Sequence, residues 1–171
     1  IKTIHVVCPS VWAWRPGRVK KFKYVDYMLC LFPFELEYCA NVNKQAFCIG
    51  HPLLDKQSDF EGTAKENIIC IMPGSRRSEI ENNLEVMIGG FNQFNTEEKY
   101  KAVIPIYKED DRYLIQDKIQ GHENISVANV VSSEILKKAK AAVVCSGTAT
   151  LEALLAEIPT TVIYKTNWFN H

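Results

Sequence analysis

The chain has 171 residues, of which 47% are hydrophobic and 23% charged, a globular composition that excludes a disordered or collagen-like protein. Twenty basic residues balance twenty acidic ones, and this zero net charge argues against a general polyanion binder, although local patches can still bind anions. The longest apolar run, residues 27–34, is far shorter than the about 20 residues of a membrane span, and we expect no signal peptide.

Residues 1–49 predict the end of one α/β unit. Strand-like residues 4–8 lead into a loop rich in Trp and Arg, and residues 18–24 have helical character. An apolar strand within residues 24–32 follows, and a second helix comes directly after it. Because the chain starts at Ile1 rather than Met, we also expect it to be a fragment.

Residues 50–66 are polar and rich in turn residues, and we predict that they link two domains. Beyond them, residues 67–171 alternate strand and helix signals. The predicted strands cover residues 68–72, 102–104, 125–131, 141–145 and 160–165. Such a repeated β-α-β order implies a parallel sheet with helices on both faces, a Rossmann-like α/β fold.

The helices of this second domain are predicted from their apolar spacing and their caps. The first helix has one apolar stripe, made of Ile80, Leu84, Met87, Ile88, Phe91 and Phe94. Ser78 and Glu81 form a possible capping box at its start. Asp110 or Asp111 is expected to cap the second helix, and Ser132 a short third one.

The cysteine and histidine patterns contain no metal-binding motif. The six cysteines are Cys8, Cys30, Cys39, Cys48, Cys70 and Cys145, and none are spaced as C-x-x-C. Most lie in apolar segments, where a free Cys behaves as a small core hydrophobe, and the cytosol is the natural compartment for such thiols. The four histidines form no H-E-x-x-H motif. We therefore expect no metal site and no cofactor.

The first candidate binding motif is Pro73-Gly74-Ser75-Arg76, which follows a predicted buried strand and precedes a helix. Ligands of open α/β sheets bind at the carboxyl ends of the strands. Gly74 lets a phosphate approach the backbone, the helix N-terminus offers N–H groups, and Arg76 adds a permanently charged fork. Because Walker A and G-x-G-x-x-G patterns are absent, an ordinary strand-to-helix turn explains the same residues.

The second candidate motif is the loop Ser146-Gly147-Thr148, with Glu152 about one turn into the following helix. Hydroxyl and N–H groups suit a diphosphate, and the Glu152 carboxylate can accept two hydrogen bonds from a ribose diol. Two such loops on nearby strands would face one ligand. A helix cap followed by an acidic residue near the helix start is the alternative explanation.

The third candidate is a stretch in which aromatic and basic residues alternate. Its loop contains Ser10, Trp12, Trp14 and Arg15, and the cations Arg18, Lys20, Lys21 and Lys23 follow without an acidic residue. This pattern suits an anionic and partly apolar partner, such as a phospholipid surface or a nucleic acid. A solvated helix face above packed Trp side chains is the alternative.

Taken together, these segments resemble the lipid-A-disaccharide synthase family of GT-B-type glycosyltransferases. The matching segments are residues 9–21, 31–35, 49–55, 72–80 and 145–165. Family members are much longer, and their N-terminal half, with an acidic residue thought to act in catalysis, and their C-terminal tail have no counterpart here. The family usually has Ser where this chain has Cys8.

The resemblance implies inverting transfer of 2,3-diacylglucosamine from UDP to 2,3-diacylglucosamine 1-phosphate, which forms the β-1,6-linked disaccharide 1-phosphate and UDP. It implies no metal, since GT-B enzymes stabilise the leaving UDP with helix dipoles and basic side chains. Residues 1–49 would then end an acceptor-side domain, residues 50–66 would be the linker, and residues 67–171 would be a UDP-sugar domain truncated at its C-terminus. The general base is expected outside this chain.

The resemblance also assigns roles to the candidate residues. The diphosphate contacts would come from Gly74, Ser75, Arg76, Ser146, Gly147 and Thr148, with Arg76 stabilising the leaving group and Glu152 holding the ribose. Residues 10–15, including both Trp side chains, would line the interdomain cleft. The cations at 18, 20, 21 and 23 would meet the anionic inner membrane, so a cytoplasmic and peripherally bound protein that can form oligomers is expected.

Three other hypotheses remain open from the sequence. The chain could be a non-catalytic UDP-binding fragment or remnant of such an enzyme. It could be a GT-B-fold UDP-sugar epimerase, which would need acid and base carboxylates but not the Trp and Arg loop. A nucleic-acid-binding module rests only on residues 12–24 and is disfavoured by the zero net charge.

Overall fold

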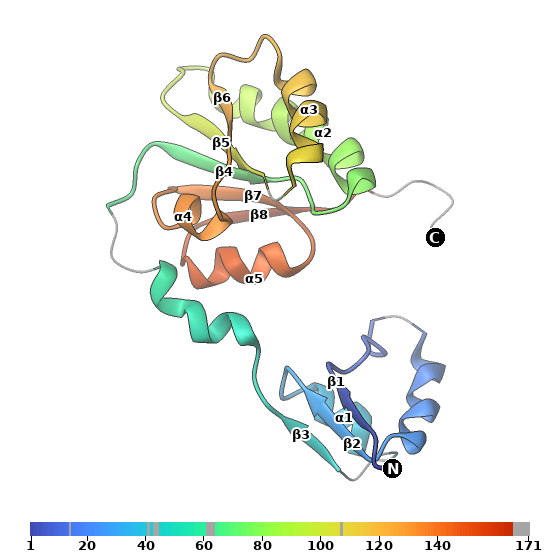
Figure 1. Cartoon of the computed structure of the whole chain (residues 1–171). Helices are drawn as coiled ribbons and strands as arrows, with labels where there is room; N and C mark the ends of the chain where they lie inside the picture. Colours follow the sequence, from blue (N-terminus) through green and yellow to red (C-terminus); the bar gives the residue numbers. More distant parts are fainter. Residues whose placement is uncertain (14, 41, 43–44, 61–63, 107, 166–171) are drawn as a thin grey trace. The chain divides into compact units, whose positions relative to one another are not determined.

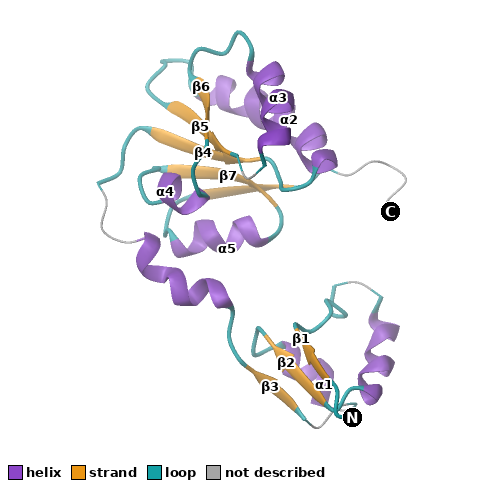
Figure 2. Cartoon of the chain, viewed as in Figure 1, coloured by secondary structure: helices purple, strands orange, loops and turns teal. Residues whose placement is uncertain are grey.

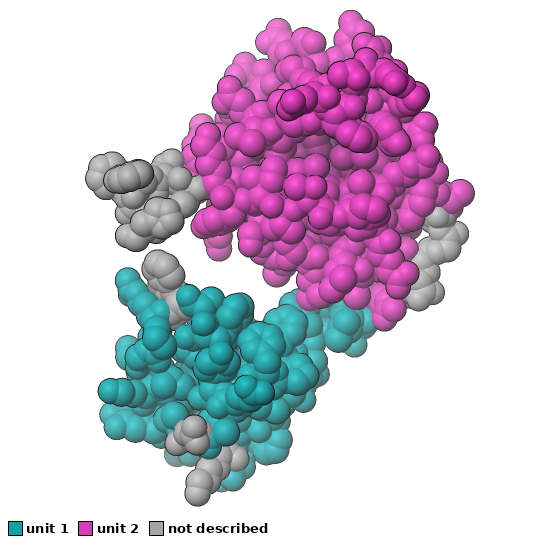
Figure 3. Space-filling view, turned by 180° about the vertical axis from the view of Figure 1, so that it is seen from behind, with its two compact units in different colours: residues 1–55 teal, residues 56–171 magenta. Residues whose placement is uncertain are grey.

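Helices and parallel strands alternate along the chain in a computed structural model (Figure 1, Figure 2). The structure describes all residues except 14, 41, 43–44, 61–63, 107 and 166–171. It divides into two compact units, unit 1 at residues 1–55 and unit 2 at residues 56–171 (Figure 3). Within the described ranges, every helix is too short or too polar to cross a membrane.

Unit 1 is a three-stranded parallel sheet in the order β1-β2-β3. Its elements are β1 (Ile4–Val6), the 3-10 helix η1 (Pro16–Tyr24), β2 (Tyr27–Cys30), α1 (Glu35–Ala40) and β3 (Ala46–Cys48). The first two strands and both helices were predicted, with wider strand bounds. Strand β3 was missed, because three residues are too few to show a period of two.

The sheet of unit 1 has one buried face and one open face. Met28 and Cys30 are fully buried against η1 and α1. On the other face Val6 and Phe47 flank Leu29 in register, and these two outer side chains are 54% and 50% exposed. Among the described residues, this apolar face therefore has no layer packed on it.

Unit 2 is a five-stranded parallel sheet in the order β6-β5-β4-β7-β8. Its strands are β4 (Ile68–Met72), β5 (Lys101–Pro105), β6 (Ile125–Ala128), β7 (Ala141–Cys145) and β8 (Thr160–Ile163). All five predicted strands are confirmed, although β6 and β8 end earlier than predicted. Pro105 closes β5, as expected of a residue that cannot donate to the ladder.

Helices cover both faces of this sheet, α2 and α3 on one and α4 and α5 on the other (Figure 1). Their bounds are α2 (Arg77–Phe94), α3 (Glu109–Ile119), α4 (Ser132–Leu136) and α5 (Thr148–Leu155). A 3-10 helix, η2 (Pro52–Phe60), lies within the predicted linker and spans the division between the units.

The central strand β4 shows why this sheet is sandwiched. Ile69 and Ile71 pack into the cluster under α2 and α3, whereas Cys70 and Met72 pack into the cluster under α4 and α5. Because side chains alternate along a strand, a run that is apolar at every position must be covered on both faces. Phe94, predicted to lie on the apolar stripe, is instead 62% exposed at the end of α2.

The cap of α2 differs from the predicted one. The helix begins at Arg77, Arg76 is the N-cap, and the capping carboxylate is that of Glu79. The predicted pair of Ser78 and Glu81 therefore lies inside the helix, because the helix starts two residues earlier than that pair requires. Glu81 accepts a hydrogen bond from Arg77 instead, 2.9 Å away.

The next two helices also start differently from the prediction. Lys108 is the N-cap of α3, so Asp110 and Asp111 lie in its first turn, where the helix dipole favours acidic side chains. Val131 is the N-cap of α4, and Ser132 is its first residue. The predicted caps are therefore wrong by one to three positions, within the spread of helix boundaries that sequence patterns leave open.

Candidate functional site

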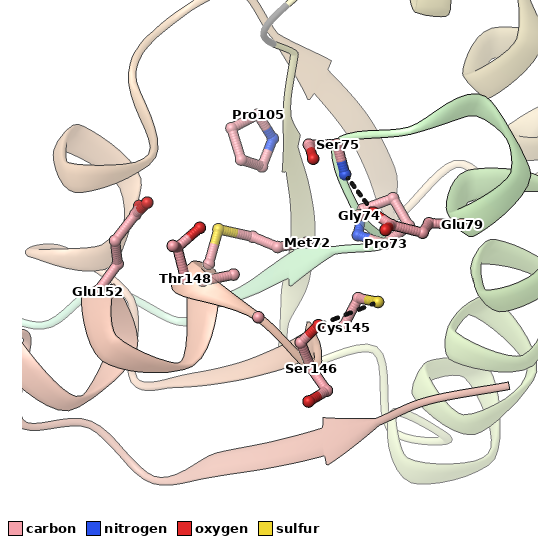
Figure 4. Close-up of a pocket in the computed structure, with 12 residues that line it drawn as sticks. Met72, Pro73, Gly74, Ser75, Glu79, Pro105, Cys145, Ser146, Thr148 and Glu152 are labelled. Atoms are coloured by element: carbon pink, nitrogen blue, oxygen red, sulfur yellow. Dashed lines mark hydrogen bonds between the residues drawn. The ribbon is translucent and has the colours of Figure 1, made fainter. Parts of the chain in front are cut away.

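A pocket of about 180 Å³ lies at the carboxyl ends of the central strands of unit 2. The chain runs from β4 through β5 to β6 on one side and then crosses to β7 and β8 on the other, so the strand order reverses between β4 and β7. Crevices at such reversal points are the ligand sites of open α/β sheets. The lining residues are Met72, Pro73, Gly74, Ser75, Glu79, Pro105, Cys145, Ser146, Gly147, Thr148, Ala149 and Glu152 (Figure 4). The two candidate phosphate loops thus line a single pocket.

Gly74 occupies a place in the first loop that only glycine fits. Its φ is +129°, a conformation that L side chains rarely adopt. A Cβ at this position would lie 2.4 Å from Cβ of Glu79 and 2.7 Å from its Oε2. The glycine is therefore needed for the close approach of α2 to the loop.

Glu79, which the sequence analysis missed, holds the first loop in place. Its Oε2 accepts hydrogen bonds from the N–H groups of Ser75, at 2.9 Å, and Arg76, at 3.3 Å, and Oε1 accepts from the Arg76 guanidinium. Burial opposes ionisation of Glu79, but these bonds together outweigh it and lower its pKa. A negative charge consequently sits in the wall of the pocket. The sequence signal for this role is an acidic residue at the third position of the helix that follows the candidate loop.

Arg76, the predicted stabiliser of the leaving group, does not line the pocket in this structure. Its side chain is 78% exposed and its guanidinium pairs with Glu79. The backbone of Arg76 is at the predicted place, the start of α2, but its guanidinium forms an ion pair with the Glu79 carboxylate. Its role in leaving-group stabilisation stays a prediction.

The second loop presents the start of α5 to the pocket. Gly147 is the N-cap of this helix with φ +152°, and both the N–H and the hydroxyl of Thr150 donate to its carbonyl. The first N–H groups of a helix have no intrahelical carbonyl partner. Ser146 and Thr148 are exposed on either side of Gly147. The loop therefore offers hydroxyl and amide donors together.

Glu152 lines the pocket from α5, on the side away from Ser75 and Glu79 (Figure 4). The hydroxyl of Ser132, from the start of α4, donates to its Oε2. Ser132 thus orients this carboxylate, a role that the sequence pattern did not suggest. A carboxylate has about four lone-pair sites, so Glu152 can still accept hydrogen bonds from a ligand diol.

Asn83 is a second residue that sequence reasoning missed, and it connects the elements around the pocket. It is fully buried on α2. Its Nδ2 donates to the carbonyls of Glu79, at 2.8 Å, and Pro73, at 3.3 Å, and contacts Sγ of Cys145 at 3.4 Å. Its Oδ1 accepts from the N–H of Lys165, at 2.9 Å. An amide on an otherwise apolar helix stripe is the signal that points to it.

The remaining predicted residues lie in unit 1, after β1. Ser10, Trp12 and Arg15 are exposed, and the Trp12 ring meets Phe34 edge-on at 5.2 Å, while Trp14 lies outside the described residues. The four cations Arg18, Lys20, Lys21 and Lys23 are exposed on η1. Their placement against a cleft or a membrane stays a prediction.

Comparison with solved structures identifies the fold. A protein described as a UDP-N-acetylglucosamine 2-epimerase from Listeria monocytogenes matches 85% of this chain and 44% of its own, with TM-score 0.55 and 16% identity. TarM of S. aureus, solved in complex with UDP among other ligands, matches 87% of this chain and 32% of its own, with TM-score 0.50 and 14% identity. The predicted α/β fold of the GT-B type, with parallel sheets, is confirmed.

Sequence comparison identifies the family. The chain is 38% identical to a lipid-A-disaccharide synthase of Burkholderia mallei and 36% identical to that of Paraburkholderia phymatum, over 98% of its own length in each case. It covers 47% of each relative, so it spans about half the length of the curated relatives it matches. The family model for lipid-A-disaccharide synthetase matches residues 1–171. The chain therefore belongs to the lipid-A-disaccharide synthetase family.

Proposed function

We propose that the pocket of unit 2 binds the UDP moiety of the donor of a lipid-A-disaccharide synthase. The observation that carries this proposal is the convergence of two loops, after β4 and after β7, on one pocket at the reversal point of the sheet. Both loops have a glycine at positive φ, and a Cβ at Gly147 would meet nothing within 4 Å, so the backbone there is open to a close ligand.

The donors of the second loop suit the diphosphate. The N-terminal amides of α5 combine a positive dipole end with hydrogens that have no partner within the helix. The hydroxyls of Ser146 and Thr148 lie beside them. Glu152, oriented by Ser132, would then accept the hydroxyls of the ribose.

In the first loop, a diphosphate must compete with a carboxylate of the protein for the backbone N–H groups. The N–H groups of Ser75 and Arg76 are bonded to the Glu79 carboxylate, which is the same kind of acceptor as a phosphate oxygen. A diphosphate that takes these N–H groups must displace that carboxylate. Displacement would also release the Arg76 guanidinium, which could then stabilise the charge that develops on the departing UDP.

The complete enzyme would transfer 2,3-diacylglucosamine from UDP to 2,3-diacylglucosamine 1-phosphate with inversion. The acceptor 6-hydroxyl must lose a proton to a base during attack, and we place that base outside this chain. Unit 1 would be the end of the acceptor-side domain, with residues 10–15 toward the sugars. Its exposed cations on η1 would attract the anionic cytoplasmic face of the inner membrane, where acylated substrates reside.

An NMR titration of the ¹⁵N-labelled chain with UDP tests this proposal, with UMP and ADP as controls. UDP is expected to shift the amides of Gly74, Gly147 and Thr148 selectively. Glu152→Ala should weaken UDP binding by about tenfold, the value of one lost hydrogen bond. Glu85→Ala, an exposed change on α2 outside the pocket, is the matched control. A folded chain whose pocket amides do not respond to UDP would contradict the assignment.

A further inference from the structure

Three cysteine thiols meet in the core of unit 1, although they lie far apart in the sequence. Sγ of Cys39 is 4.0 Å from Sγ of Cys8 and 3.9 Å from Sγ of Cys30, and all three sulfurs lie within 4.8 Å of one another. The three residues are 0–3% exposed. Because the spacings are 31 and 9 residues, no short sequence motif reveals this cluster.

The fold of unit 1 brings the three thiols together from three elements. Cys30 is the last residue of β2, and Cys8 follows the neighbouring parallel strand β1. Between β1 and Cys8, Val7 has φ +73°, a conformation that β-branched residues rarely adopt. Val7 is exposed and Cys8 is buried, so this turn directs the chain back into the core. Cys39 comes from α1, which covers the same face of the sheet.

The sulfur separations match those of a metal thiolate centre. A metal at 2.3 Å from three sulfurs in a trigonal plane holds them about 4.0 Å apart. A disulfide, by contrast, would bring two sulfurs to about 2 Å, and all three cysteines are free. Within the described part of the chain, these three thiols form the complete ligand set, with no fourth Cys, His or carboxylate in the group.

The buried surroundings of the three thiols determine their protonation state. Burial raises the pKa of Cys8 and of Cys39 to about 11 and that of Cys30 to about 12. The cluster therefore consists of neutral thiols at neutral pH. Binding would form three metal–sulfur bonds and release three protons, one from each thiol, with no change in oxidation state.

We propose that Cys8, Cys30 and Cys39 form a binding site for one soft, thiophilic cation of the Cu(I) class, coordinated by three thiolates. Thiolate ligands select such ions, and a three-ligand site disfavours Zn(II), which takes four ligands in structural sites. The site is separate from the pocket of unit 2. It is not implied by the family resemblance, since Cys8 is one of the positions at which this chain departs from the family pattern.

The test is an anaerobic titration of the reduced full chain with Cd(II), a spectroscopic probe for soft thiolate sites, followed by competition with Cu(I). One equivalent of Cd(II) per chain should produce thiolate-to-metal charge-transfer absorption, and Cu(I) should displace it. Cys39→Ser and Cys8→Ser should each weaken binding by at least about 100-fold. Cys48→Ser is the matched control, because Cys48 is exposed and lies opposite Cys30 in register on β3. It should bind as the wild type does.

A second measurement does not depend on the folding of any variant. The ¹¹³Cd NMR shift of the wild-type complex reports how many thiolates bind the metal, and a single resonance at the value for three sulfurs is expected. A resonance for one or two sulfurs would overturn the proposal. So would a wild-type titration without charge-transfer absorption, or binding that Cys48→Ser abolishes while Cys39→Ser retains it in a folded chain.

Discussion

Replacing Gly74 by Ala should destabilise unit 2 and displace a loop that lines its pocket. The φ of +129° is strained for any residue with a Cβ, which costs about 1–3 kcal/mol. The new Cβ would also lie 2.4 Å from Cβ of Glu79, closer than real contacts allow, so the loop or the helix must shift. A shift that breaks the cap made by Glu79 costs about 1 kcal/mol more. The sum predicts a loss of about 2–4 kcal/mol.

Denaturant unfolding followed by the amide signals of β4 and β7 measures this loss in unit 2 alone. Gly89→Ala is the matched control, because Gly89 lies inside α2 and its Cβ would meet nothing within 4 Å. That change should stabilise the helix by about 0.5–1 kcal/mol. If Gly74→Ala unfolds within about 0.5 kcal/mol of the wild type, the argument from φ and from close approach is wrong.

Three further predictions concern other parts of the chain. Asn83→Ala should cost about 2–3 kcal/mol in denaturant unfolding, because it removes the hydrogen bonds that this buried amide donates to the Pro73 carbonyl and accepts from the Lys165 N–H, and a loss below about 1 kcal/mol would refute this. Folding lowers the pKa of Glu79, so its ionised carboxylate stabilises the fold above the ordinary pKa of 4.5, and this stabilisation is lost as the pH falls below that value. Glu79→Gln should flatten this part of the stability–pH curve. A curve that the substitution leaves unchanged would show that Glu79 does not stabilise the fold in this way. Neutralising Lys20, Lys21 and Lys23 together should reduce co-sedimentation of the chain with anionic vesicles and leave co-sedimentation with neutral vesicles unchanged. If the variant and the wild type bind anionic vesicles equally, these residues form only a solvated helix face.

The architecture of unit 2 was predictable because its central strands β4 and β7 are apolar at every position. Residues 68–72 and 141–145 became β4 and β7 with the predicted bounds. Continuous apolar runs between helix signals specify a parallel sheet strongly. Helix starts were less predictable, since several acidic and hydroxyl residues compete for each cap, and Glu79 rather than Glu81 closes the first turn of α2.

The sequence also indicated which two loops would form a site, because each follows an apolar strand and precedes a helix. It did not indicate what the side chains do there. Asn83 contacts Cys145 and Lys165, which are 62 and 82 residues away, and such contacts leave no local pattern. Ser132 likewise bonds to Glu152, 20 residues away. The three thiols of unit 1 are the same case, since their proximity comes from strand order and a turn at Val7.

The open apolar face of the unit 1 sheet has a consequence for how the chain loses its structure. Three strands of three or four residues, packed on one side only, retain few buried contacts to resist opening. Strand β4, by contrast, is sandwiched between two clusters. Amide hydrogens of β1–β3 should therefore exchange with solvent earlier and as one cooperative group, while those of β4 and β7 remain protected until unit 2 unfolds. The chain would then behave as two foldons of unequal stability, with the thiol cluster in the weaker and the nucleotide pocket in the stronger.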